Sequence, residues 1–464
     1  MKSLRQRAGN CCSKGASLSI AAFDRGTLLK KIKSHDARVG IIGLGYVGLP
    51  LALAASDKGF PVIGFDVDSR RVEELNDGCS PLEHISDDSI RAARTARLFE
   101  ATDDFARLSE ADAIMICVPT PLGLYREPDL TYVEGAMRMI AKALRPGQLI
   151  SLESTTYPGT TAEVCRPILE ESGLKSGRDF YLAFSAERED PGNHQYSTRS
   201  IPKVVGGDGP QALELALALY GGIFERVVAV SSLATAEAVK ITENVFRAVN
   251  IALVNELKTI YLRMGIDIFE VIDAAKTKPF GFMAFYPGPG LGGHCIPIDP
   301  FYLTWKARAY GINTRFVELA GEINSAMPQW VVDRLAEALD RRRGKGLSKA
   351  RVLVIGVAYK KNVSDLRESP ALAAIQLLKD RGAAVDYHDP YVKAIPETRS
   401  HAGLSGMASV DLVEATVRGY DAALVVTDHD DIDWRIVAEH SDLIVDTRNV
   451  LKRSGFSGEK IVPA

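Results

Sequence analysis

The sequence contains two groups of short apolar runs, separated by a long stretch with a different pattern. Short runs of this kind are typical of strands that are buried on both faces of a parallel sheet. We therefore predict a parallel sheet in each half of the chain. The runs of the first group are residues 38–42, 61–65, 113–118, 148–152, 181–184, 204–206 and 226–230, and those of the second are 351–356, 384–387, 422–426 and 443–445.

Helical spacing replaces the short runs between the two groups. Residues 233–264 contain no Pro and no Gly, and their apolar residues recur at the spacing of a helix. We predict one long helix that ends at Gly265, with further helices at 266–275, 301–310 and 314–327. A helix longer than one domain face needs is suited to a homo-oligomer interface, so we expect a homodimer or a larger homo-oligomer.

The whole pattern predicts an α/β fold in which a central helical domain with one long helix joins two Rossmann-like, doubly wound domains. The first residues are basic and polar and lack the apolar core of a signal peptide, so we expect a flexible tail there. The predicted parts are the tail at 1–23, a dinucleotide-binding domain at 24–230, a helical and dimerisation domain at 231–330 and a second Rossmann-like domain at 331–464.

Composition excludes several classes of protein. Hydrophobic residues make up 46% and charged residues 25% of the chain, as in globular proteins, and the net charge of −3 gives no electrostatic case for nucleic acid or an anionic membrane. No apolar run approaches the roughly 20 residues that cross a bilayer. The scattered cysteines predict neither a metal site nor a disulfide framework, and they fit a reducing cytoplasm. They are Cys11, Cys12, Cys79, Cys117, Cys165 and Cys295.

A glycine motif lies between the first predicted strand and the helix that follows it. Residues 43–48 read GLGYVG, and Asp66 ends the next strand. In such a motif Gly43 permits a tight turn, Gly45 lets the backbone approach a pyrophosphate, and Gly48 allows close packing of helix on strand. The helix N-terminus favours phosphate, and Asp66 is placed to bind a ribose hydroxyl, which favours NAD.

Other residues border this dinucleotide site. Arg70 and Arg71 follow Asp66, and either could pair with a phosphate or be solvated. Ligands of doubly wound sheets bind at the carboxyl ends of the strands. Pro119 and Thr120 follow the predicted strand at 113–118, so we expect them to contact the dinucleotide.

A second chemical motif lies at residues 287–300, which read PGPGLGGHCIPIDP. The prolines exclude a regular helix and the glycines permit close approach, so we predict a rigid loop that presents the thiol of Cys295. A free cysteine taken alone is more often inert than reactive. Lys240 and Asn244 share one face of the long helix, and helix geometry leaves open whether that face points inward or to solvent.

The second predicted sheet begins with a single glycine turn. Gly356 follows the first strand but the other two glycines of a dinucleotide motif are missing, so we do not expect a second dinucleotide site. Lys360, Lys361 and Arg367 follow that strand end, and such cations are suited to phosphate.

Together these motifs resemble those of the UDP-glucose/GDP-mannose dehydrogenase family. The resemblance extends from about residue 24 to the end of the chain and is closest to the bacterial branch that oxidises UDP-N-acetylglucosamine at C6. The segments that carry it are GLGYVGLPLA, KITEN, PGPGLGGHCIPIDP and YKKNVSDLRESP, and for the branch TPLGLYREPDL, ESTTYPGTT and EREDPGN.

The resemblance implies a cytoplasmic enzyme that makes polysaccharide precursors. NAD would oxidise the C6 alcohol of a UDP-sugar twice, through a thiohemiacetal and a thioester on Cys295. The implied catalytic residues are Cys295, Lys240, Asn244, Asp299, Glu187 and Thr155. The implied NAD-binding residues are Gly43, Gly45, Tyr46, Val47, Gly48, Asp66, Arg71, Pro119, Thr120 and Arg367. Gly292, Gly293, Tyr359, Lys360 and Arg448 would bind the UDP-sugar, and no metal is implied.

The sequence departs from UDP-glucose enzymes at three positions. It has Pro191 where they commonly carry a Glu, so Glu189 or Asp190 could replace that acid, or the role could be absent. It also has Ala186 where their motif has a proline, and Ile298 where they often have a lysine. These differences favour an N-acetylated sugar over glucose. We predict UDP-N-acetylglucosamine as the substrate, and UDP-GalNAc, UDP-ManNAc and UDP-glucose stay open as alternatives. Two further hypotheses are a two-electron 3-hydroxyacid-type dehydrogenase and a non-catalytic nucleotide-sugar sensor. The role of His294 is open.

Overall fold

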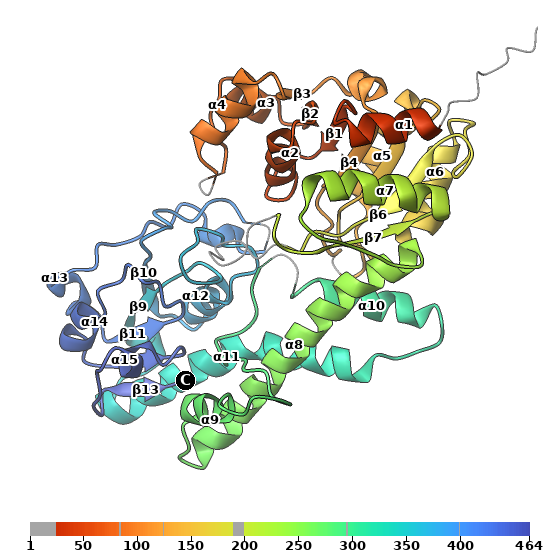
Figure 1. Cartoon of the computed structure of the whole chain (residues 1–464). Coiled ribbons are helices and arrows are strands. Elements are labelled where there is room, and N and C mark those ends of the chain that lie inside the picture. Colours follow the sequence, from red (N-terminus) through yellow and green to blue (C-terminus); the bar gives the residue numbers. More distant parts are fainter. Residues whose placement is uncertain (1–24, 83–84, 124, 189–198, 294–295, 399) are drawn as a thin grey trace, which may run out of the picture.

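The computed structural model describes residues 25–82, 85–123, 125–188, 199–293, 296–398 and 400–464. Two lobes, each built on a sheet, are joined by long helices, which confirms the predicted α/β fold (Figure 1). No helix in this part of the chain is long and apolar enough to cross a membrane. The predictions for the tail at 1–23 and for Glu189, Asp190, Pro191, His294 and Cys295 lie outside the described residues.

The first lobe contains an eight-stranded sheet of order β3-β2-β1-β4-β5-β6-β7-β8. Its first six strands are parallel and follow the Rossmann order, whereas β7 runs antiparallel to β6. The edge strand β3 was not predicted, because its sequence, FEAT, is not a continuous apolar run. The strands are β1 Val39–Ile42, β2 Val62–Phe65, β3 Phe99–Thr102, β4 Ala113–Ile116, β5 Leu149–Leu152, β6 Tyr181–Phe184, β7 Lys203–Gly207 and β8 Val227–Ala229.

Helices cover both faces of this sheet, which explains why its inner strands β1, β2 and β4 contain no polar side chain. In β1, for example, Val39 and Ile41 belong to the core on one face and Ile42 to the core on the other. The helices are α1 Arg25–Lys33, α2 Gly48–Asp57, α3 Ser69–Asn76, α4 Asp87–Thr95, α5 Thr131–Ala143, α6 Arg166–Glu170 and α7 Pro210–Ile223, with short turns at Phe105–Glu110 and Thr161–Cys165.

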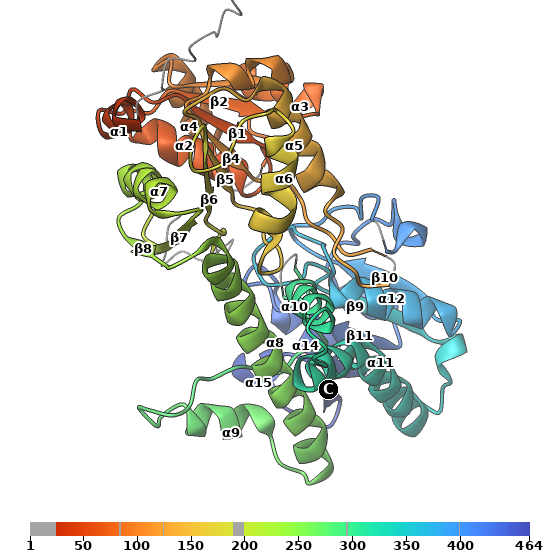
Figure 2. The same cartoon turned by 90° about the vertical axis from the view of Figure 1, so that its right-hand side faces the viewer.

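The long helix α8, Leu233–Arg263, extends from the first lobe along the second, as Figures 1 and 2 show. It ends as predicted just before Gly265, whose φ is +74°. The helix α9, Ile268–Ala275, follows. The next helix, α10, is Asp299–Arg308 and therefore begins two residues earlier than predicted, because proline is tolerated in the first turn of a helix.

The prediction that the following helix ends at residue 327 is wrong. The helix α11, Arg315–Arg343, continues through Pro328. A proline removes one backbone hydrogen bond, but Val331, Val332 and Leu335 beyond it pack into the core of the second lobe. Tertiary burial thus outweighs the local cost. The domain boundary proposed at residue 330 lies inside this helix.

The second lobe contains a five-stranded parallel sheet of order β10-β9-β11-β12-β13, the flavodoxin-like doubly wound order. Its strands are β9 Arg351–Ile355, β10 Ala384–His388, β11 Ala422–Val425, β12 Ile444–Asp446 and β13 Ile461–Pro463. Its helices are α12 Pro370–Asp380, α13 Glu414–Val417, α14 Trp434–His440 and α15 Val450–Arg453, with short turns at Leu347–Lys349 and Ala402–Leu404.

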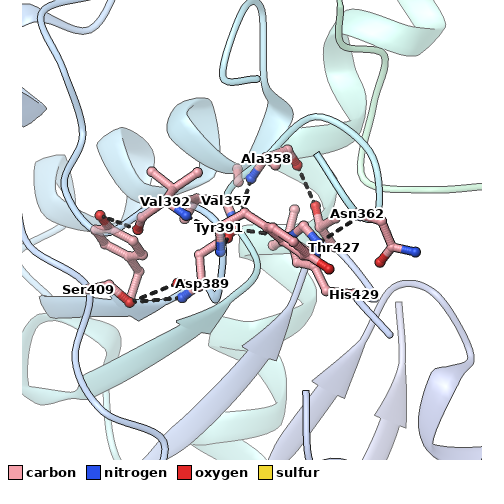
Figure 3. Close-up of polar contacts among 12 residues, drawn as sticks. Val357, Ala358, Asn362, Asp389, Tyr391, Val392, Ser409, Thr427 and His429 are labelled. Atoms are coloured by element: carbon pink, nitrogen blue, oxygen red, sulfur yellow. Dashed lines mark hydrogen bonds and ion pairs between the residues drawn. The ribbon is translucent and has the colours of Figure 1, made fainter. Parts of the chain in front are cut away.

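Asp389 closes the glycine turn of this second sheet, as Figure 3 shows. It follows β10 as Asp66 follows β2, and its carboxylate accepts hydrogen bonds from the backbone N–H groups of Val357 at 2.7 Å and Ala358 at 3.1 Å. His429 Nε2 lies 3.0 Å from the same oxygen. In the first turn Asp66 likewise binds the N–H of Leu44, but there the next residue, Gly45, is left open. At the corresponding position of the second turn Ala358 carries a side chain and its N–H is bound by Asp389, which gives a physical reason to expect no second dinucleotide site.

The glycines of the first turn differ in what a side chain would meet, and this difference predicts two outcomes. A Cβ on Gly48 would lie 1.8 Å from the carbonyl oxygen of Gly43, whereas a Cβ on Gly45 would meet nothing within 4 Å. We expect Gly48→Ala to destabilise the first lobe by about 1–3 kcal/mol through overpacking. Gly45→Ala should keep the wild-type Tm but bind NAD at least about tenfold more weakly, because the methyl group fills the space for the pyrophosphate.

Thermal unfolding and NAD titration of both variants check this prediction. Equal NAD affinity of Gly45→Ala and wild type would contradict the assignment of the turn to the pyrophosphate.

Candidate active site

One cavity of about 1380 Å³ brings together most of the predicted site residues. It is lined by the first lobe, α8, the segment after α9 and the second lobe. Of the described site residues, only Gly48 and Asp299 do not line it. Those that do are Gly43, Gly45, Tyr46, Val47, Asp66, Arg71, Pro119, Thr120, Thr155, Glu187, Lys240, Asn244, Gly292, Gly293, Tyr359, Lys360, Arg367 and Arg448.

The glycine turn and Asp66 form one end of the cavity. Asp66 is 6% exposed, and its carboxylate accepts hydrogen bonds from the backbone N–H groups of Leu44 at 2.9 Å and Asp68 at 3.0 Å. Arg71 donates to the same carboxylate at 3.1 Å, so it is paired with Asp66 while its side chain stays 35% exposed. The open space at Gly45, the helix N-terminus and the fixed Asp66 together fit a dinucleotide.

Arg367 connects the second lobe to this turn. Its guanidinium lies 4.6 Å from the centre of the Tyr46 ring and is held by Asp365 at 2.6 Å. The backbone carbonyl of Arg367 accepts a hydrogen bond from the N–H of Gly293 at 2.9 Å. Arg367 thus contacts both the dinucleotide end of the cavity and the loop at residues 287–300, which we call the glycine loop.

Gly292 and Gly293 are required by packing against the second lobe. A Cβ on Gly292 would lie 2.6 Å from the Cβ of Tyr359, and one on Gly293 would lie 2.9 Å from the Tyr359 ring. The space that these glycines leave is therefore filled by Tyr359. The two glycines therefore have a structural role in packing, in addition to the predicted role of letting the substrate approach.

Lys240, Asn244 and Asp299 meet where α8 contacts the start of α10. Lys240 is 8% exposed, and Asn244 and Asp299 are each 2% exposed, so this face of α8 points inward. The Asn244 amide donates a hydrogen bond of 2.5 Å to the Asp299 carboxylate. Burial raises the pKa of Asp299 to about 7, although the charge of Lys240 and the Asn244 hydrogen bond favour the ionised form.

The start of the glycine loop is also held by α8. Asn255 accepts a hydrogen bond from the N–H of Gly288 at 2.9 Å, and Lys258 donates one to the carbonyl of Gly288 at 3.1 Å. On its other side, Gly288 has no room for a Cβ, which would lie 2.6 Å from Arg448 Nη1. Burial and the charge of Arg448 lower the pKa of Lys258 to about 7. The loop is thereby fixed between α8 and a cation of the second lobe.

Glu187 and Thr155 line the cavity on the side of the first lobe. The Glu187 carboxylate accepts a hydrogen bond of 2.6 Å from the N–H of Arg188. Sequence reasoning missed four charged residues of the lining: Glu153, Arg188, Glu243 and Arg247. Each had a local signal, because Glu153 follows a predicted strand, Arg188 follows Glu187, and Glu243 and Arg247 lie close to Asn244 on α8.

Comparisons with known proteins agree with this arrangement. This chain matches three domains of the UDP-glucose/GDP-mannose dehydrogenase family. Residues 37–224 match the NAD binding domain, residues 234–326 the central domain and residues 353–453 the UDP binding domain. UDP-N-acetyl-D-glucosamine 6-dehydrogenase of Pseudomonas aeruginosa is 40% identical over 362 residues, which are 77% of this chain and 84% of that relative.

Relatives that are named for another sugar are similar to this chain over a larger share of its length. UDP-N-acetyl-D-mannosamine dehydrogenase of Pyrococcus horikoshii is 34% identical over 422 residues, 89% of this chain and 96% of the relative. A solved structure of UDP-D-ManNAc dehydrogenase from Pyrococcus horikoshii superposes with a TM-score of 0.82 at 33% identity, covering 92% of this chain and 98% of that one. With all three domains matched in order, the chain belongs to the UDP-glucose/GDP-mannose dehydrogenase family and is an NAD-dependent nucleotide-sugar 6-dehydrogenase.

Proposed function

We propose that this enzyme oxidises the C6 hydroxyl of a UDP-N-acetylhexosamine, preferentially UDP-N-acetylglucosamine, to the uronic acid. The observation that carries the proposal is the single cavity lined by the glycine turn, by Lys240 and Asn244 of α8, and by Lys360 and Arg448 of the second lobe. A dinucleotide and a nucleotide sugar can therefore meet at the inward face of α8. The 40% identical relative acts on UDP-N-acetyl-D-glucosamine, which supports this choice of sugar.

The first oxidation needs a group that accepts the proton of the C6 hydroxyl, a role that we assign to Lys240, and hydrogen-bond donors around the reacting oxygen. Bound NAD supplies the hydride acceptor for two successive oxidations. We assign Lys240 and Asn244 to hydrogen-bond the C6 oxygen, and this role is supported by the fact that both line the cavity and both are almost fully buried. Asn244 donates one amide hydrogen to Asp299 and keeps the other for the substrate.

The second oxidation uses the thiol of Cys295, whose place in the chain is between Gly293 and Ile296, both of which line the cavity. The thiolate bonds to the aldehyde carbon, and the carbonyl oxygen takes a proton, which gives a thiohemiacetal. Loss of hydride and of the hydroxyl proton gives a thioester. Water then adds to the carbonyl carbon, the C–S bond breaks, and the acid leaves with regeneration of the thiolate.

Hydrolysis of the thioester requires groups that orient water and accept its proton. We assign this role to Glu187, Thr155 and Asp299. Glu187 and Thr155 line the cavity, and Asp299 lies behind Asn244 with a pKa of about 7. A group with this pKa can accept a proton at neutral pH and release it again.

The stoichiometry and the sugar are tested in one assay. We expect two NADH per UDP-N-acetylglucosamine consumed, and a higher kcat/KM for this sugar than for UDP-GalNAc, UDP-ManNAc or UDP-glucose. Cys295→Ser should remove the four-electron oxidation, because no thioester can form. One NADH per sugar with release of aldehyde would support a two-electron dehydrogenase, and binding without turnover would support a sensor. A different preferred sugar would overturn only the specificity.

The pH dependence follows from the burial of Asp299. Since its pKa is raised to about 7, the carboxylate form becomes more abundant between pH 6 and 8. We expect kcat to rise over this range with a midpoint near 7. Asp299→Asn should lower kcat by about a hundredfold at pH 8, and by less at pH 6, where Asp299 of the wild type is itself mostly protonated. A flat profile in the wild type, or full activity in Asp299→Asn, would contradict the role of this carboxylate. Steady-state kinetics at constant ionic strength measure both.

We also propose that α8 forms a homodimer interface. Leu253, Ile260 and Met264 repeat at spacings of seven and four residues and are all exposed, so they form one apolar stripe on the helix. A second copy of the chain would bury this stripe. Light scattering should give the mass of a dimer, and Leu253→Glu combined with Ile260→Glu should give a monomer. A monomeric wild type would contradict the interface.

A further inference from the structure

Three charged side chains meet beside the proposed hydrolysis site, and the roles assigned above use only one of them. Lys203, the first residue of β7, is 2% exposed, and Glu153, which follows β5, is 1% exposed. Lys203 Nζ lies 2.6 Å from a carboxylate oxygen of Glu153 and 3.6 Å from one of Glu187. A single buried ammonium group therefore stands between two carboxylates, and both carboxylates line the cavity.

The ammonium group of Lys203 also contacts the backbone next to Glu187 and two aromatic rings at the end of α7. Lys203 Nζ donates a hydrogen bond of 3.2 Å to the carbonyl of Ala186, the residue directly before Glu187. It also lies 5.9 Å and 5.3 Å from the ring centres of Tyr220 and Phe224. Burial alone would lower the pKa of Lys203, but the two carboxylates raise it above its ordinary value, so the group is charged.

Glu153 has the contacts of a fixed counter-charge. One of its oxygens accepts the hydrogen bond from Lys203, and the other accepts one from the hydroxyl of Tyr220. That hydroxyl also shares a hydrogen bond of 2.7 Å with Ser151. Both oxygens of Glu153 thus accept hydrogen bonds from buried donors. In Glu187 one oxygen accepts a hydrogen bond from the N–H of Arg188, and the other faces Lys203 at the longer distance of 3.6 Å.

We propose that Lys203 is a positioning residue for Glu187 and that Glu153 holds the ammonium group of Lys203 in place. This inference rests on the proposed role of Glu187 in thioester hydrolysis. Two carboxylates that both approach one buried ammonium group repel each other, so without that cation one of them tends to stay protonated. Lys203 keeps Glu187 ionised, so that Glu187 can accept a proton from water, and its bond to Ala186 fixes the backbone that carries Glu187.

A set of four variants separates positioning from packing. Lys203→Met removes the cation and leaves two carboxylates. Lys203→Met with Glu153→Gln removes the cation and one carboxylate. Glu153→Gln alone and Lys203→Arg are the matched controls, because Lys203→Arg keeps the charge. Each protein is measured for kcat, for KM of NAD and of UDP-N-acetylglucosamine, for the pH profile of kcat, and for Tm at several pH values.

Lys203→Met should lower kcat at least about tenfold and change the KM of NAD by less than about threefold. It should also move the midpoint of the pH profile about one unit above the value set by Asp299, because Glu187 then also has to lose a proton in this range. The double variant should return the midpoint to the wild-type position and recover only part of kcat, since the bond to Ala186 is still missing. Lys203→Arg should retain more activity than Lys203→Met. A wild-type kcat and pH profile in Lys203→Met would overturn the proposal. If only the double variant folds, a full wild-type kcat in that variant would overturn it.

Stability reports on the charge arrangement without any turnover. In Lys203→Met the paired carboxylates bind an extra proton in the folded state, so stability is lost as the pH rises from about 5 to 8. We expect Tm to fall over this range relative to wild type, and the double variant to show no such fall. If the wild type itself fails to oxidise any UDP-sugar, the proposed function fails, while the Tm comparison still decides whether Lys203 separates the two carboxylates.

Discussion

The contact between Asn244 and Asp299 is the interaction on which the site depends, because it fixes the end of the glycine loop to the long helix. The start of the same loop is fixed to the same helix, through Asn255 and the backbone of Gly288. Asn244 and Asn255 are about 16 Å apart along the axis of α8. The helix therefore sets the distance between the two ends of the loop. The N–H of Gly293, near the middle, is bonded to the second lobe.

This arrangement requires buried charge. Asp299 is a carboxylate and Lys258 an ammonium group, and burial moves the pKa of each to about 7, from below and from above respectively. Each shift means that the folded protein disfavours the ionised form, which lowers stability. Proteins commonly retain such destabilised groups where function uses them. Here one group lies at the end of the glycine loop and the other at its start, so the destabilising groups are concentrated around a single segment.

Much of the fold was predictable because its signals are local. The apolar runs, the glycine turn at residues 43–48 and the helix without proline or glycine each specify an element by themselves. The continuation of α11 through Pro328 was not predictable, because it depends on Val331 and Val332 being buried against a distant sheet. The short edge strand β3 likewise has no continuous apolar run.

The candidate site shows the same division. Residues that belong to motifs, such as Lys240 and Asn244, were identified, and only the fold shows that they point inward. Lys203 and Glu153 are 50 residues apart, and their meeting depends on the order of β5, β6 and β7 in the sheet. Asp389 is similar, because its role in closing the second glycine turn depends on the pairing of β9 with β10.

The central claim is our proposal that a covalent thioester on Cys295 is hydrolysed with the help of Glu187, which lines the cavity, and of Asp299, which is buried behind Asn244. The direct measurement is the mass of the peptide that contains Cys295, after Asp299→Asn is mixed with UDP-N-acetylglucosamine and NAD and quenched with acid. The account predicts that this peptide gains the mass of the oxidised sugar nucleotide, and that Cys295→Ser combined with Asp299→Asn shows no gain. No adduct on Asp299→Asn, together with full four-electron oxidation by Cys295→Ser, would contradict the account.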